Sequence, residues 1–181
     1  MEEPEIDVRI RRIEQEDGPQ IRQVLTAAFD SETEANLVAA LTAENAIEYG
    51  LVAEAAGHHI GSIIFSRLTI VGGDEPIRAL ALGPVAVHPT RQGEGLGGQL
   101  IEASLNVPEA AAWDRVMLVG DAPYYKRFGF TRLDGVVMPP PTNPDRGLGR
   151  ARRRIGKWPW EYCSPFSHHM GHGHRSGKAL C

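Results

Sequence analysis

The stretch that decides the fold is Leu82-Gly-Pro-Val-Ala-Val-His-Pro-Thr-Arg-Gln-Gly-Glu-Gly-Leu-Gly-Gly98. An apolar run leads through a short loop into a cluster of glycines, and residues 95–105 follow with helical spacing. A strand, a glycine turn and a helix N-terminus are therefore predicted in that order. Unblocked N–H groups and the positive end of the helix dipole make such a turn suitable for phosphate oxygens. A tight turn that needs glycine only for its dihedral angles would explain the same residues.

Two phosphate-binding patterns compete for these glycines. Gly93, Gly95 and Gly98 match G-x-G-x-x-G, which is typical of dinucleotide-binding proteins. That motif usually follows its strand directly, whereas Gly93 lies five residues past His88. The strands predicted before it are also antiparallel neighbours. A P-loop is excluded because no G-K-[ST] occurs.

The segments around the turn predict a mixed α/β protein. Alternating and apolar runs predict strands, helical spacing predicts helices, and Ser31 with Glu34 predicts a capping box. Gly83-Pro84 predicts a bulge or splay, because proline cannot donate to a ladder. The fold class is thus a mostly antiparallel central sheet flanked by helices. The expected strands are 6–10, 49–55, 60–71, 77–88, 116–119 and 130–137. The expected helices are 21–28, a second helix that the capping box opens and that carries Leu37, Val38 and Leu41, 95–105 and 123–128.

A second motif joins the glycine turn. Gln92, Gly95 and Gly97 match Q/R-x-x-G-x-G/A, and Tyr124-Tyr-Lys-Arg-Phe-Gly-Phe130 follows after one helix and one strand. With both motifs in this order, the chain resembles the GNAT superfamily of N-acetyltransferases over residues 6–138. The resemblance implies acetyl-CoA as co-substrate and an amine as acceptor, either a small molecule or a protein amino group.

The resemblance also implies roles for particular residues. The pyrophosphate would lie on the glycine turn and the pantetheine arm along the preceding strand. Tyr125 would protonate the departing thiolate, although an aromatic residue at such a site could equally pack between helix and sheet. The cofactor-binding residues so implied are Val85, Ala86, Val87, Gln92, Gly93, Gly95, Leu96 and Gly97.

The base that deprotonates the amine is not identified by the sequence. The polar candidates near the inferred site are Glu54, His88, Glu94 and Asp121. Each has a plainer explanation: solvated charge for the two glutamates, strand closure for His88, and a helix cap for Asp121. Two other functions stay open. These are a catalytically inactive acyl-CoA sensor and a dinucleotide-binding protein that uses Gly93, Gly95 and Gly98.

Charge divides the chain into two parts. Residues 1–144 hold 11 basic and 21 acidic side chains, a balance of −10, whereas residues 145–181 hold 8 and 2, a balance of +6. The net charge of −4 disfavours a nucleic-acid binder. No apolar run suits a membrane helix, and the acidic N-terminus does not suit a signal peptide. A cytoplasmic protein is predicted, and a homodimer is compatible with the sequence.

The C-terminal part shows no amphipathic periodicity. Its histidines and cysteines match no closed zinc pattern, so no metal site is predicted. Family members usually continue into another strand, but no strand is predicted after Pro144. The expected organisation is an N-acetyltransferase domain at 1–144 and an atypical tail at 145–181. We hypothesise that the tail is disordered or frame-shifted. Translating the encoding DNA in its other two frames tests the second account.

Overall fold

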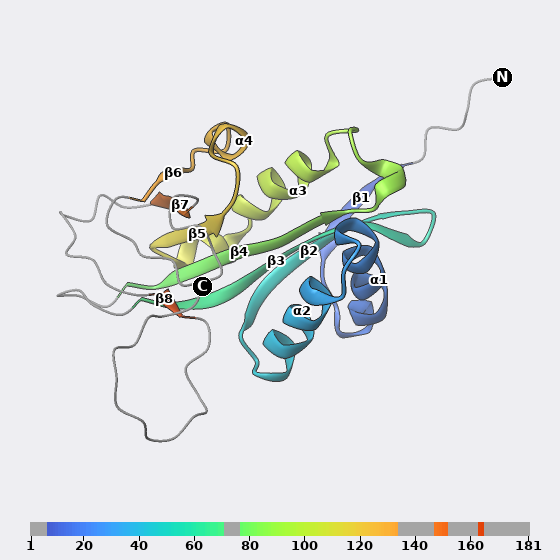
Figure 1. Cartoon of the computed structure of the whole chain (residues 1–181), viewed down its shortest axis with the longest axis horizontal. Helices are drawn as coiled ribbons and strands as arrows, with labels where there is room; N and C mark the ends of the chain where they lie inside the picture. The colour runs from blue at the N-terminus through green and yellow to red at the C-terminus, as the bar shows by residue number, and fades with distance from the viewer. Residues whose placement is uncertain (1–6, 71–76, 134–146, 152–162, 165–181) are drawn as a thin grey trace. The chain divides into compact units, whose positions relative to one another are not determined.

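The computed structural model describes residues 7–70, 77–133, 147–151 and 163–164 (Figure 1). The chain forms two compact units. Unit 1 comprises Met1–Phe65 and Leu82–Ala110, and unit 2 comprises Ser66–Ala81 and Ala111–Cys181. Two long strands, β3 (His58–Ile70) and β4 (Ala79–Val87), contribute residues to both units.

Unit 1 is a sheet with helices on both faces. Its strand order is β1-β2-β3-β4, and β1 runs antiparallel to β2 with Arg9 opposite Glu54. Besides its parts of β3 and β4, the elements are β1 (Arg9–Arg12), η1 (Gln15–Asp17), α1 (Gly18–Phe29), α2 (Thr33–Ala43), β2 (Ile47–Ala55), η2 (Pro89–Arg91) and α3 (Leu96–Leu105), and η3 (Pro108–Ala112) begins at its end.

Alternation along β2 decides which helix each residue meets. Val52 belongs to an apolar cluster with α1 and α2 that also holds Ala35 and Ala86. Tyr49 points the other way, and its hydroxyl donates to the Ser104 carbonyl oxygen of α3 over 3.2 Å. Because successive strand residues face opposite sides, one strand serves two helical layers.

The N-terminus of α2 differs from the prediction. The expected capping box needs Ser31 to accept from the N–H of Glu34, but the helix begins at Thr33 with Glu32 as its N-cap residue and no side-chain cap. Ser31 Oγ instead accepts the Thr33 N–H at 3.1 Å. The capping box was therefore wrong, because serine satisfied a local turn two residues on.

Unit 2 is built around β5. The first residues of β4 run parallel to it, with Ala79 opposite Arg115 and Ala81 opposite Met117, and β7 and β6 follow on its other side. Leu68, Ala79 and Met117 form its apolar centre. The further elements are β5 (Arg115–Val119), α4 (Ala122–Lys126), β6 (Thr131–Arg132), β7 (Gly147–Ala151) and β8 (Cys163–Ser164), which pairs with β3.

The prediction that no strand follows Pro144 was wrong. Strand β7 at 147–151 runs antiparallel to β5, with Met117 opposite Gly149 and Val119 opposite Gly147. Its sequence Gly-Leu-Gly-Arg-Ala contains no β-branched residue, so its side chains carry no strand signal. Backbone pairing with β5 supplies the structure. The histidines of the tail lie outside the described residues. The disorder of the tail, the frame-shift and the domain boundary at residue 144 remain predictions.

The predicted fold class is confirmed: the protein is mixed α/β with a mostly antiparallel sheet and flanking helices. The parallel register of β4 on β5 ends at Ala81, directly before the region of Gly83-Pro84 where a splay was predicted. Because β4 and β5 pair in parallel, the glycine turn and α3 form a β-α-β connection after the strands β2, β3 and β4. None of the helices in the described ranges is long and apolar enough to span a membrane.

Candidate active site

The glycine turn has the backbone that its sequence predicts. Gly93 has φ +85°, and Gly95, the N-cap residue of α3, has φ +80°. A Cβ at either position would meet nothing within 4 Å, so left-handed backbone, not crowding, requires glycine here. Gly95 provides no side-chain cap. The N–H groups of the first turn of α3 therefore have no intrahelical acceptor and are suited to an external anion.

Side chains of the loop tie the turn to β4. Gln92 Nε2 donates to the Val87 carbonyl oxygen over 2.9 Å, so the two segments implied as cofactor-binding are joined directly. His88 N–H donates to the Ile60 carbonyl oxygen over 2.9 Å, and His88 Nδ1 accepts the Thr90 N–H at 3.4 Å. His88 thus ends the strand and caps the next turn, as its plainer explanation states. These bonds hold the turn against the end of β4.

The end of β4 combines buried and half-buried residues. Ala86 is buried, whereas Val85 and Val87 on the opposite face are half-buried. Gly83 adopts φ +148°, which side chains rarely tolerate, and Pro84 has no N–H. The strand is therefore irregular directly before the three residues implied to run along the pantetheine.

Tyr125 lies in unit 2, on the short helix α4. Asp121 caps this helix, because its Oδ2 accepts the Tyr124 N–H at 3.1 Å. The Tyr125 ring meets Phe130 edge-on with centroids 5.9 Å apart. Burial raises the pKa of the Tyr125 hydroxyl above its ordinary value of 10.0. The phenol consequently keeps its proton at neutral pH, as a general acid must.

Gly120, before α4, leaves room for the Tyr125 ring. A Cβ there would lie 2.8 Å from Tyr125 Cδ2 and closer still to Cε2. We expect Gly120→Ala to lower the free energy of unfolding by about 1–3 kcal/mol, because the ring must move. Denaturant unfolding measures this. In a Tyr125→Ala background the same substitution should cost much less, and an equal cost in both backgrounds would show that the ring is not the obstacle.

The acidic candidates for the base already have partners. Glu54 accepts from Arg11 Nε at 2.9 Å, and Glu94 accepts from Arg91 Nε at 2.8 Å. Asp121 is used as the helix cap. These contacts agree with the plainer explanation for Asp121, and they show both glutamates to be paired charges.

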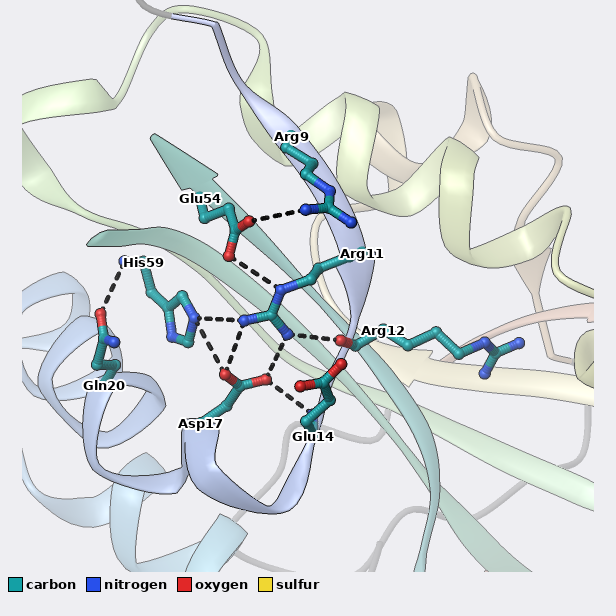
Figure 2. Close-up of polar contacts among 8 residues, drawn as sticks. All are labelled: Arg9, Arg11, Arg12, Glu14, Asp17, Gln20, Glu54 and His59. Atoms are coloured by element: carbon teal, nitrogen blue, oxygen red, sulfur yellow. Dashed lines mark hydrogen bonds and ion pairs between the residues drawn. The ribbon is translucent and has the colours of Figure 1, made fainter. Parts of the chain in front are cut away.

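Figure 2 shows a polar network in unit 1 that sequence reasoning missed. Arg11 donates to both carboxylate oxygens of Asp17, at 2.7 and 2.9 Å, and also to Glu54. Asp17 is 5% exposed, and its bonds with Arg11 lower its pKa to about 2 against the opposing effect of burial. His59 Nε2 lies 3.3 Å from Asp17 Oδ1. Burial holds the pKa of His59 below its ordinary value of 6.5. The residues of this network come from β1, η1, β2 and β3, so no local spacing in the sequence reveals the network.

A cavity of about 790 Å³ lies between α1 and α2 in unit 1. Its lining is mainly apolar, with Leu25, Ala35 and Val38 among the contributing side chains. None of the residues predicted as cofactor-binding or catalytic lines it. In the described ranges, no three His, Cys, Asp or Glu side chains are grouped as metal ligands.

Comparison with known proteins identifies the family. The Acetyltransferase (GNAT) domain matches residues 9–133, which include the glycine turn and Tyr125. The chain belongs to the GNAT acetyltransferase family. It is 37% identical over 122 residues to the uncharacterized N-acetyltransferase YjhQ of Escherichia coli K12, and the match covers 66% of this chain and 67% of that protein.

Solved GNAT structures share the fold. The acetyltransferase of Brucella melitensis, crystallised with acetyl-CoA, is 34% identical with a TM-score of 0.72, over 87% of this chain and 94% of that one. YhbS of Escherichia coli, crystallised with CoA, is 27% identical with a TM-score of 0.74, over 83% and 84% of the two chains. The predicted GNAT resemblance is therefore confirmed.

Proposed function

We propose that this GNAT protein transfers an acetyl group from acetyl-CoA to a primary amine by direct attack. The observation that carries the proposal is the glycine turn: uncapped N–H groups at the start of α3, held against β4 by the bond from Gln92 to Val87. The relatives crystallised with acetyl-CoA and CoA support the choice of ligand. The acceptor is either a small molecule or a protein amino group.

In this proposal the two bound parts of the cofactor use different backbone groups. The pyrophosphate accepts hydrogen bonds from the turn formed by 92–97, where Gly93 and Gly95 let the backbone approach closely. The pantetheine amides pair with residues 85–87 in the manner of an added strand. The irregular backbone at Gly83-Pro84 leaves this stretch available for a ligand strand.

The chemistry needs nitrogen to lose two protons and sulfur to gain one. The ammonium form of the acceptor first loses a proton, and the amine nitrogen then bonds to the thioester carbon. A backbone N–H of the strand stabilises the oxyanion of the tetrahedral intermediate. The carbon–sulfur bond breaks with its electron pair on sulfur, and Tyr125 protonates the thiolate. Its pKa, raised by burial, keeps that proton in place until the sulfur leaves. The attached nitrogen loses its second proton as the amide forms, and solvent returns a proton to the Tyr125 oxygen.

Calorimetry tests the ligand. We expect the protein to bind acetyl-CoA and not NAD. Gly95→Ala should weaken acetyl-CoA binding about tenfold, because a methyl group at φ +80° disfavours the backbone that aims the N–H groups. NAD binding without acetyl-CoA binding would instead support the dinucleotide-binding function.

Gly57→Ala is the matched control for Gly95→Ala. Gly57 has φ +79° and equally open surroundings, but it lies in the turn between β2 and β3. Both variants should lose about 1 kcal/mol of stability, and only Gly95→Ala should lose affinity. Equal affinities would remove the glycine turn from the cofactor site. Acetyl-CoA binding without amine-dependent CoA release would favour the sensor function.

A further inference from the structure

Glu34, in the first turn of α2, has an unusual carboxyl group. Its Oε2 atom is buried and accepts no hydrogen bond, although the side chain as a whole is partly exposed. Among the described residues it is the only acidic side chain with such an oxygen. A desolvated carboxylate oxygen without a donor is costly, so this position calls for a partner that the polypeptide itself does not supply.

The other acidic side chains considered for the reaction have such a partner. Glu54 pairs with Arg11, Glu94 pairs with Arg91, and Asp121 accepts a backbone N–H. The capping box that would have used Glu34 does not form, because Ser31 bonds to Thr33. Glu34 therefore lacks the ion pair or helix-capping bond that Glu54, Glu94 and Asp121 make.

The placement of Glu34 relates it to the proposed acetyl-CoA strand. Ala35, the next residue, lies in the same apolar cluster as Ala86 of β4. Val38 packs against that cluster, and residues four apart share one face of a helix. Glu34 thus lies on the face of α2 that is turned to the apolar cluster containing Ala86. All of these residues belong to unit 1.

We propose that Glu34 binds the ammonium group of the acceptor and accepts its proton. This rests on the proposed acetyl transfer. A primary ammonium group supplies both the missing donor and a compensating positive charge. One N–H bond breaks with its electron pair on nitrogen, and the proton goes to a Glu34 oxygen. The neutral amine attacks the thioester, and Glu34 later releases the proton to water. Acceptors carrying a primary alkylammonium group are the substrate class that this site fits.

The substitution Glu34→Gln tests the role while keeping the shape of the side chain. The probes are 1,4-diaminobutane and Nα-acetyl-lysine amide, whose side-chain amine is free. Release of CoA is the readout. We expect kcat/KM for the amine to fall about 100-fold at pH 7 with unchanged acetyl-CoA affinity. The deficit should shrink as the pH approaches 10.4, where half of an alkylamine is already neutral. A merely structural carboxylate would give a deficit that does not depend on pH.

Glu32→Gln is the control variant. Glu32 is exposed, lies two residues earlier and pairs with Arg22, so its removal should leave kcat/KM unchanged. Thermal unfolding checks that Glu34→Gln folds. If Glu34→Gln does not fold, Glu34→Asp is used in its place. We expect Glu34→Asp to have a reduced kcat/KM and the same pH profile as the wild type. Wild-type activity of the folded Glu34 variant at every pH would overturn the inference.

Two further readouts separate this inference from the proposed function. Failure of the wild type to bind acetyl-CoA in calorimetry refutes the acetyl transfer itself. If acetyl-CoA binds but neither probe is acetylated, the ¹³C resonance of the Glu34 carboxyl is titrated with n-butylammonium. We expect the ammonium ion to shift this resonance. An unchanged resonance at saturating n-butylammonium overturns the role of Glu34 alone.

Discussion

Tyr125→Phe should lower kcat about 100-fold or more and leave the affinity for acetyl-CoA almost unchanged. The substitution removes one hydroxyl group and keeps the ring that packs edge-on against Phe130. The departing thiolate then loses its proton donor, and general acid catalysis contributes about 10²–10⁴ in rate. Steady-state kinetics with acetyl-CoA, together with calorimetric binding, separates the two effects.

Tyr124→Phe is the control for this experiment. Tyr124 is the adjacent tyrosine, and its ring stacks under the Arg127 guanidinium at 4.1 Å, a contact that phenylalanine retains. We expect nearly wild-type kcat for Tyr124→Phe. An unchanged kcat for Tyr125→Phe would remove Tyr125 from the mechanism and leave it a packing residue. Burial raises the pKa of Tyr125 above 10.0, so the free enzyme holds this proton at neutral pH. Ionisation of Tyr125 should therefore not reduce kcat at neutral pH.

Arg11→Met should destabilise unit 1 by about 3 kcal/mol and lower the melting temperature by roughly 6–12 °C. Methionine replaces much of the apolar stem of arginine but none of its donors. Asp17 would keep a buried carboxylate without its two Arg11 bonds, and Glu54 would lose its closest cation. Removing one partner of a buried ion pair is costly because the other charge stays desolvated. Calorimetric thermal unfolding measures the change.

Arg9→Met is the matched control. Arg9 lies on the same strand and also pairs with Glu54, but its side chain is 71% exposed and the ion pair spans 3.7 Å. An exposed pair contributes little, so the free energy of unfolding should change by less than about 0.5 kcal/mol. Equal effects of the two substitutions would contradict the importance of the Arg11–Asp17 contact.

The same network predicts how stability depends on pH. Asp17 has a pKa of about 2 in the fold against an ordinary value of 3.8, so its contribution to stability is present above pH 4 and is lost as the pH falls toward 2. The pKa of His59 is also lowered, so the unfolded chain binds its proton first and acid again favours unfolding. In Arg11→Met the pKa of Asp17 rises. Acid unfolding should therefore begin at a higher pH than in the wild type.

Local patterns were sufficient for much of the fold. The glycine turn, the helix after it and the strands around it were all predicted within a few residues of their observed ends. These elements depend on hydrophobic period, on glycine at positive φ and on helix caps, which are properties of neighbouring residues. Asp121 as the cap of α4 and His88 as the closure of β4 are of the same kind.

Long-range pairing decided the rest. Strand β7 exists because β5 offers backbone partners, although 147–151 has no strand-like side chains. The Arg11–Asp17–His59 contacts join residues up to 48 positions apart, and no spacing rule connects them. The sequence by itself determined the GNAT motifs and the α/β class, because both are written in short-range patterns. Only the tertiary structure decided which carboxylates are paired and which oxygen of Glu34 is buried without a donor. The reason is that ion pairs and hydrogen bonds depend on the distance between side chains in the folded protein, and residues far apart in the sequence can lie close together there.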